Sequence, residues 1–410
     1  MSERPQALQP LGLVLLAAAG TFALTMGERQ SMGLFIGSIN TQTGLGLASV
    51  SLAFAIGQLW WGLTQPLAGM VSDRYGAGRV LVAGVLLVCL GTGLIPFMKG
   101  TAGLILAIGV LAAGGAGMAG PAVLMSAVTR LVAPGRRALA TGVVNAGGSF
   151  GQFIFAPLAQ AVTAAAGWVA ALQTLALLTL LALPAAWVLR APAAVAAAAG
   201  SAPRMGTGAA VRQALADPSF RLLALGFSVC GFHVAFLATH LPGVVASCGL
   251  APQVGAWALA MLGLFNIVGS LGIGVLMGWR GGRLPMKSLL AAIYAARALA
   301  VALFVLAPKT TPVVLVFAAV MGLTFLSTVP PTAGLVARFF GPAHMATLFG
   351  LAMVSHQVGG FLGAWLGGKA YEAYGNFNAI WLADIALALL AALLHLPIRE
   401  RRPLAVGAAA

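Results

Sequence analysis

The chain has 410 residues, of which 60% are hydrophobic and only 7% are charged. A soluble fold of this length cannot bury so much apolar surface, so the composition excludes a soluble protein and places most of the chain in lipid. The net charge of +15 would indicate a nucleic-acid-binding protein if the chain were soluble. The positive residues instead lie mainly in short loops between apolar segments, so we expect them to set membrane topology and to bind no nucleic acid.

Twelve apolar segments follow one another along the chain, each long enough to cross a bilayer, for which about 20 apolar residues suffice. They cover approximately residues 11–38, 46–71, 79–98, 103–131, 137–163, 167–190, 219–246, 253–278, 286–307, 311–337, 344–368 and 377–397. We therefore predict an all-α polytopic membrane protein with twelve transmembrane helices and with both termini on one side. The first segment is too long for a signal-peptide core, so we expect it to be retained.

The first segment contains an acid and a base side by side, Glu28 and Arg29. Charged residues inside a transmembrane helix are costly, and as a rule they serve a pathway or a binding site. Neighbouring positions point about 100° apart around a helix, so the two side chains cannot neutralise each other on one face. At least one of them must find a partner on another helix, in a water-filled cavity or in a substrate.

Lysine and arginine are distributed unequally between the two sets of loops. If the N-terminus is cytoplasmic, the cytoplasmic segments hold Arg4, Arg74, Arg79, Arg130, Arg136, Arg137, Arg190, Arg204, Arg212, Arg221, Arg280, Arg283, Lys287, Arg338, Arg399, Arg401 and Arg402. The opposite face holds only Lys99, Lys309 and Lys369. This imbalance predicts cytoplasmic termini, and we expect the membrane to be a bacterial-type inner membrane. Arg29 and Arg297 belong to neither set, because both fall at membrane depth.

The chain also repeats itself. The loop at 69–76 recurs in degenerate form at 274–281, an offset of 205 residues. With an offset of 208, one set of four residues matches another: Arg130, Pro134, Gly142 and Gly151 correspond to Arg338, Pro342, Gly350 and Gly359. We predict two six-helix bundles of parallel topology, residues 1–190 and 219–410. A cytoplasmic linker rich in small residues, 191–218, joins them and contains a short amphipathic turn at about 211–216.

The loop between the second and third segments reads Gly69-x-x-x-Asp73-Arg74-x-Gly76-x-x-Arg79. This loop resembles the signature loop of the major facilitator superfamily, and the resemblance extends over nearly the whole chain. It implies a conformational role for Asp73, Arg74 and Arg79, in which the acid pairs with an arginine and latches the cytoplasmic helix ends in one state. In the second half Gly278 occupies the position of the acid, so we expect this latch in the first half only.

Within that superfamily the chain resembles bacterial relatives of the monocarboxylate porters. Four stretches carry the resemblance: 29–35, 239–242, 327–332 and 355–359. Better-known porters of this kind have an Asp and an Arg four residues apart in the eighth helix, where this chain has Asn266 and Ser270. Either Arg29 or Arg297 therefore replaces the usual anion contact, or the substrate is not a simple monocarboxylate.

Arg29 is the first candidate for binding an anion, because a guanidinium matches a carboxylate with two parallel hydrogen bonds. The alternative is a structural pair with a distant acid. Glu28 is the candidate for proton coupling, since a buried carboxyl gains from taking up a proton. The offset of 205 relates Glu28 to His233, which would complete a proton relay across the two halves unless it only bonds a carbonyl. For His240, near a helix end at Pro242, a role in gating or structure is favoured over substrate contact.

Arg297 lies in the middle of the ninth segment and has two possible roles. It contacts the substrate, or it forms a buried pair with Asp384 of the twelfth segment. Four further polar residues on helices expected to line or close the cavity are candidates for substrate contact, with polar contacts between helices as the alternative: Asn145, Asn266, His356 and Gln357. Pro330 and Pro331 should kink the tenth helix, as expected of a gating helix.

These observations predict a secondary transporter that moves a small organic anion, with a monocarboxylate favoured, by alternating access. The expected partners are this anion, protons in symport and the lipid bilayer, and we expect a monomer. No Walker-type phosphate-binding run occurs, so nothing indicates ATP as the driver. We expect neither an enzyme nor a cofactor, and the scattered cysteines indicate no metal site. A proton-driven exporter of drugs or lipophilic products is the first alternative. A membrane sensor without net transport is the second, but it would need a larger cytoplasmic domain.

Overall fold

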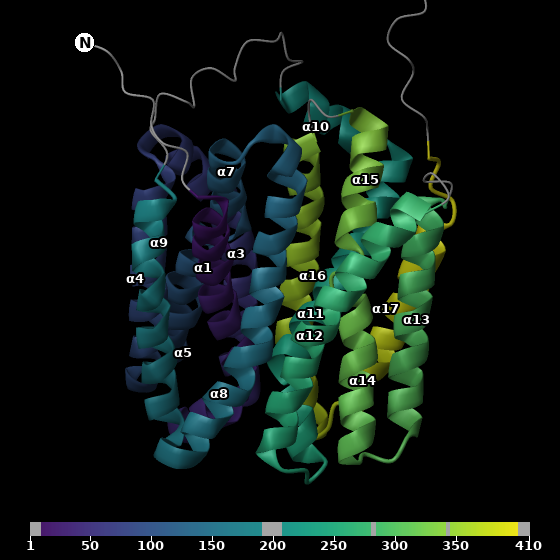
Figure 1. The fold of residues 1–410 in the computed structure, drawn as a ribbon. Helices are drawn as coiled ribbons and strands as arrows, with labels where there is room; N and C mark the ends of the chain where they lie inside the picture. The colour runs from purple at the N-terminus through teal and green to yellow at the C-terminus, as the bar shows by residue number, and fades with distance from the viewer. Residues whose placement is uncertain (1–9, 191–206, 280–283, 342–344, 401–410) are drawn as a thin grey trace, which may run out of the picture. The chain divides into compact units, whose positions relative to one another are not determined.

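A computed structural model describes residues 10–190, 207–279, 284–341 and 345–400, and all regular structure in these ranges is helical (Figure 1). The linker residues 191–206 lie outside them, as do the predicted cytoplasmic residues Arg4, Arg204, Arg280, Arg283, Arg401 and Arg402. The helices up to residue 190 are α1 (Leu11–Ser31), η1 (Met32–Phe35), α2 (Ile36–Thr43), α3 (Leu47–Tyr75), α4 (Ala77–Leu94), η2 (Ile95–Phe97), α5 (Thr101–Leu104), η3 (Ile105–Ala112), α6 (Ala113–Met118), α7 (Pro121–Leu131), η4 (Pro134–Arg136), α8 (Arg137–Thr179), η5 (Leu180–Ala182) and α9 (Leu183–Val188). The later helices are α10 (Thr207–Ala216), α11 (Pro218–Ser247), α12 (Pro252–Gly278), α13 (Met286–Leu306), α14 (Thr311–Thr324), α15 (Val329–Phe340), α16 (Met345–Tyr374) and α17 (Asn378–His395).

Ten helical stretches in the described ranges are long and apolar enough to cross a membrane. One of them, Leu139–Val188, has 50 residues and is interrupted at Gly167, where φ is 86°. Divided at this glycine, it supplies two spans. The 30-residue helix α16 adds another of membrane-crossing length. The described residues thus supply twelve helical stretches of membrane-crossing length, the number predicted from the sequence.

The described residues group into two compact units. The first unit takes in Met1–Met32 and Trp60–Ser201, and the second takes in Gly33–Leu59 and Ala202–Ala410. The boundary therefore runs through α3. Residues 33–59 join the second unit, although the sequence repeat places them in the first half of the chain.

Close packing explains why residues 33–59 belong to the second unit. A Cβ added to Gly33 would lie 2.2 Å from the carbonyl oxygen of Ala238 in α11. At the start of α3, the backbone N–H of Ala48 donates to the carboxylate of Glu372 in α16, at 2.9 Å. The end of the first helix and the start of the second are thus fixed on α11 and α16.

One helix contact recurs in both units. In the first unit α1 lies along α8, and a Cβ on Gly151 would lie 2.0 Å from the carbonyl oxygen of Ala23. In the second unit α11 lies along α16, and a Cβ on Gly359 would lie 1.7 Å from the carbonyl oxygen of Ser228. Residues 23 and 228 are 205 apart, and 151 and 359 are 208 apart, which are the offsets of the sequence repeat. Figure 1 shows both helix pairs, and the absence of a side chain permits each close approach.

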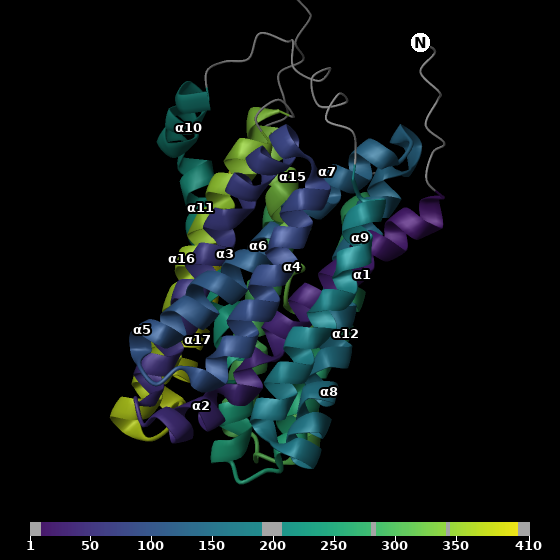
Figure 2. The ribbon, with the colours of Figure 1, turned by 90° about the vertical axis from the view of Figure 1, so that its left-hand side faces the viewer.

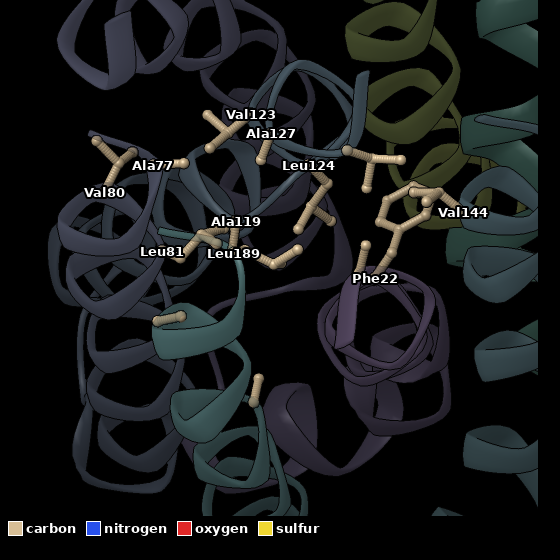
Figure 3. Close-up of a cluster of buried hydrophobic side chains, with 14 of the residues drawn as sticks. Phe22, Ala77, Val80, Leu81, Ala119, Val123, Leu124, Ala127, Val144 and Leu189 are labelled. Carbon is tan, nitrogen blue, oxygen red and sulfur yellow. The ribbon is translucent and has the colours of Figure 1, made fainter. Parts of the chain in front are cut away.

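An apolar cluster fills the interior of the first unit. It draws side chains from α1, α4, α7, α8 and α9, and Figure 3 shows them converging. The labelled members are Phe22, Ala77, Val80, Leu81, Ala119, Val123, Leu124, Ala127, Val144 and Leu189. In the second unit, α10 packs at the start of α11 and next to α16 (Figure 2). This helix includes the predicted amphipathic turn and is longer than predicted.

Two spans are broken at equivalent places. In the first unit α6 ends at Met118 and α7 begins at Pro121, and in the second unit α14 ends at Thr324 and α15 begins at Val329. Residues 121 and 329 are 208 apart. Proline suits the first turn of a helix, where its missing N–H is not needed. Pro330 and Pro331 therefore lie in the first turn of α15, directly after a break at 325–328.

Candidate functional site

The polar centre of the first unit is Glu28. It lies on α1 with 1% of its surface exposed, and its Oε1 accepts a hydrogen bond from the hydroxyl of Thr92 on α4, at 2.6 Å. A buried carboxylate needs such donors, because it has lost its hydration. Glu28 is therefore directed at the contact between α1 and α4.

Arg29 points to a different neighbour. Its guanidinium carbon lies 4.7 Å from the ring centroid of Trp61 on α3. A guanidinium attracts the π face of a tryptophan and still has donors at its edge. Glu28 thus contacts α4 whereas Arg29 contacts an aromatic ring on α3, and Arg29 is half-buried there.

The equivalent place in the second unit holds His233 and Arg297. Residues 28 and 233 are 205 apart, and so are 92 and 297. Nδ1 of His233 on α11 lies 3.4 Å from Nη1 of Arg297 on α13. The contact between Glu28 and Thr92 thus has a counterpart in the second unit, with an imidazole and a guanidinium in place of a carboxylate and a hydroxyl.

Arg297 is held at the break between α14 and α15. Its Nη2 donates to the carbonyl oxygens of Thr324 and Phe325, the second at 2.7 Å. The carbonyls that end a helix have no partner within it, so a cation there is stabilising. Nearby, Oδ1 of Asn266 accepts from the backbone N–H of Leu326 at 3.0 Å. Side chains of α12 and α13 thus satisfy the backbone of the broken helix.

Asp384 on α17 completes this buried group. Its Oδ1 lies 3.0 Å from Nε2 of His233, and its backbone oxygen lies 3.2 Å from the same nitrogen. Both residues are almost fully buried. The sequence suggested a direct pair between Arg297 and Asp384 as one alternative. In the structure the imidazole of His233 contacts both residues.

The other predicted contact residues differ in their surroundings. The buried ring of His356 packs on Phe227 with centroids 4.8 Å apart, and the neighbouring Gln357 has an amide nitrogen that donates to no described residue. Asn145 is exposed on α8. Nε2 of His240 lies 2.7 Å from the carbonyl oxygen of Ala364, consistent with a structural role.

The three predicted latch residues lie around the loop between α3 and α4. Asp73 pairs with Arg130 at the end of α7. Arg74 lies over the ring of Tyr75, 5.3 Å from its centroid, and Arg79 is exposed. Only the first of these three is therefore in an acid–arginine pair within the described residues.

The second unit also has an acid–arginine pair. Arg338 matches Arg130 in the repeat, and its partner is Glu400, which follows α17. The other oxygen of Glu400 accepts from the backbone N–H of Lys287 at 2.7 Å, which caps the start of α13. A comparison of the two loops had predicted an acid in the first half only. The structure supplies one to the second half from the end of the chain.

A comparison with known families identifies the architecture. Residues 17–306 match the model of the Major Facilitator Superfamily, which is most of the chain. The chain belongs to this superfamily. It is therefore a membrane transporter and not an enzyme, as the sequence predicted.

Relatives and solved structures agree with this assignment. The transporter is 27% identical over 381 residues to monocarboxylate transporter 13 of Rattus norvegicus, with 92% of this chain and 86% of the relative covered. It is 25% identical over 415 residues to monocarboxylate transporter 11 of Homo sapiens, with 98% and 86% covered. Among solved structures, a nucleoside transporter matches with a TM-score of 0.76 at 14% identity, covering 95% of this chain and 99% of that one. A D-xylose–proton symporter matches with a TM-score of 0.69 at 14% identity, covering 95% and 98%.

Sequence reasoning missed three residues of these polar groups in the transporter. Thr92 was detectable, because the offset of 205 leads to it from Arg297. Cys230, whose Sγ lies 3.1 Å from Oγ1 of Thr328 and 3.6 Å from Arg297 Nη2, resembles a small packing residue in the sequence. Glu400 is an isolated acid in a basic tail and gives no periodic signal.

Proposed function

We propose that this transporter moves a small monocarboxylate together with a proton by alternating access. The membrane would be a bacterial-type inner membrane with both termini in the cytoplasm, as the loop charges favour. The partners would be the anion, protons and the bilayer, and the protein would act as a monomer.

The observation that carries the proposal is the arrangement of Glu28 and Arg29. One helix presents a buried acid to a hydroxyl and, at the next position, a half-buried base to an aromatic ring. The base can receive a carboxylate, and the acid can take the accompanying proton. Neutralising both charges lowers the cost of moving the site through the membrane interior.

The relatives named monocarboxylate transporters support the choice of substrate. The eighth helix of this chain has Asn266 and Ser270 where related porters have an acid and an arginine. Asn266 accepts from the backbone of Leu326, and the hydroxyl of Ser270 donates to Asn266 at 3.4 Å. Arg297 donates to backbone carbonyls at the helix break. Arg29 is thus the base best placed to replace the missing anion contact.

Uptake into proteoliposomes under an inward proton gradient tests the proposal. The panel consists of labelled lactate, pyruvate, acetate, oxalate and an aromatic acid. We expect Arg29→Ala to abolish gradient-driven uptake. Glu28→Gln should remove the dependence on the gradient while it preserves exchange of the labelled acid. Lys99→Ala, which removes an exposed base from a loop, is the matched control and should transport like the natural protein.

Two results would refute the proposal. If none of the acids moves, the substrate is not a carboxylate, and export of a neutral or cationic lipophilic compound becomes the leading explanation. If Arg29→Ala transports as well as Lys99→Ala, the anion binds elsewhere.

A further inference from the structure

The contacts of His233 fix the position of its proton. A guanidinium has only N–H donors, so Nδ1 of His233, which faces Arg297, must be the accepting nitrogen. In the neutral ring the proton then lies on Nε2. This N–H is directed at the backbone oxygen of Asp384, at 3.2 Å. A second proton on the ring would place an N–H against an N–H of Arg297, so His233 is poorly suited to take one up.

Asp384 is differently placed. It is 0% exposed, and neither carboxylate oxygen accepts a hydrogen bond from a described residue, although Oδ1 lies 3.0 Å from Nε2 of His233. A buried carboxylate without donors is costly, and proton binding removes that cost. The positive charge of Arg297 opposes proton binding. Proton binding therefore relieves the cost of burying the Asp384 carboxylate, and the positive charge of Arg297 permits its ionised form.

The other titratable groups on the helices that pack against α17 contact residues other than Asp384. On α13 the hydroxyl of Tyr294 donates to the carbonyl oxygen of Gly226 at 2.8 Å. On α11 the thiol of Cys230 lies against Thr328 and also 3.6 Å from Nη2 of Arg297. On α16, which also touches α17, His356 packs on Phe227 and Lys369 lies over Trp365. On α17 itself Nδ1 of His395 bonds Ala391.

We propose that Asp384 is the proton-binding carboxyl of the second unit and that His233 links its charge state to Arg297 at the break between α14 and α15. A proton from water joins the carboxylate and forms a carboxylic acid, and no other bond is made or broken. The net charge of Asp384, His233 and Arg297 then rises from zero to +1. His233 acts here as a positioning residue, and Arg297 supplies the positive charge.

This charge change couples proton binding at Asp384 to anion binding near Arg297. With Asp384 ionised, its charge balances the guanidinium of Arg297, and the group has no attraction for an anion. With Asp384 protonated, Arg297 is the unbalanced charge in a buried environment, where an anion is strongly favoured. Because linkage is reciprocal, binding of an anion would in turn favour binding of the proton. In its effect on transport, the inference rests on the proposed function.

Infrared spectroscopy of the full-length protein in lipid tests proton binding without any substrate. The chain has three aspartates: Asp73 is exposed in the last turn of α3, Asp217 caps the start of α11, and only Asp384 is buried. Acidification should produce a carbonyl band of a protonated acid that shifts when the protein contains aspartate isotope-labelled at the side-chain carboxyl. The band should disappear in Asp384→Asn, move in Asp384→Glu and persist in Glu28→Gln. Labelling of the unsubstituted chain shows whether an aspartate binds the proton even if Asp384→Asn does not fold.

The inference is overturned if no aspartate band appears at any pH at which the protein stays folded, or if the band persists in Asp384→Asn. That result would make Asp384 a permanently ionised partner of Arg297. Transport gives a second readout with labelled lactate. Asp384→Asn should lose proton-driven accumulation and retain lactate exchange, and unchanged accumulation would contradict the inference. If the natural protein does not move lactate, the proposed function fails, whereas the infrared result still decides whether Asp384 binds a proton.

Discussion

Removal of the Arg297 guanidinium should destabilise the second unit strongly. Arg297→Met takes a donor from the carbonyl oxygens of Thr324 and Phe325 and leaves the ionised carboxylate of Asp384 without its positive neighbour. Breaking one partner of a buried charge pair costs about 3–5 kcal/mol, because the other charge stays buried. The carbonyl oxygen of Thr324, which loses its side-chain donor, adds about 1–3 kcal/mol, whereas that of Phe325 keeps the thiol of Cys230. The single substitution therefore threatens a large part of the stability of the fold.

Removal of Asp384 at the same time should restore part of this loss. The double variant Arg297→Met/Asp384→Asn still lacks the donor at the helix break but no longer buries an unbalanced charge. In a double-mutant cycle we expect a coupling of about 2 kcal/mol. The assay is denaturant unfolding of the purified full chain in one detergent, at an alkaline pH that keeps Asp384 ionised. Lys309→Met, which removes a base near the end of α13, is the control and should be additive with Asp384→Asn. Additivity of the Arg297 and Asp384 substitutions would refute the charge coupling.

Two further substitutions test packing and the second acid–arginine pair. Gly359→Ala should lower the stability by about 1–3 kcal/mol, because its Cβ would lie 1.7 Å from a carbonyl oxygen of α11, although alanine is the better helix former. Gly350→Ala on the same helix meets nothing within 4 Å and should not lower it, so equal melting temperatures of the two variants would contradict this reasoning. Glu400→Gln should speed amide hydrogen exchange in the first turn of α13, because the cap on Lys287 weakens. Unchanged exchange there would show that this cap does not stabilise the helix start.

The transmembrane architecture could be predicted because lipid imposes a strong pattern. Every backbone group must be bonded within the membrane, so spans are continuous apolar helices that the sequence displays directly. The repeat was equally detectable, and the equivalent helix contacts made by Gly151 and Gly359 show it in the structure. The grouping of residues 33–59 with the second unit was not detectable. It depends on close contacts with α11 and α16, which leave no local periodic signal.

The buried polar residues were easier to find in the sequence than their contacts. Glu28, Arg29, His233 and Arg297 stand out because charged and imidazole side chains are rare at membrane depth. The position of His233 between Arg297 and Asp384 depends on the packing of three helices, and composition does not specify it. For the same reason, the sequence suggested a direct pair of Arg297 with Asp384 and did not reveal the carbonyls at the helix break.

Equivalent positions in the two units carry different polar side chains, and this difference bears on the proposed coupling of proton and anion binding. The repeat places residue 28 beside residue 92, and residue 233 beside residue 297, but the side chains are a carboxylate and a hydroxyl in one unit and an imidazole and a guanidinium in the other. Each unit nevertheless has one acid and one strong base at membrane depth: Glu28 and Arg29 in the first unit, and Asp384 and Arg297, which both contact His233, in the second. A proton or a monovalent anion bound alone would leave either group with an unbalanced charge, which is costly in the membrane. Binding the two together restores neutrality, which is the physical reason for proposing that a proton accompanies the anion.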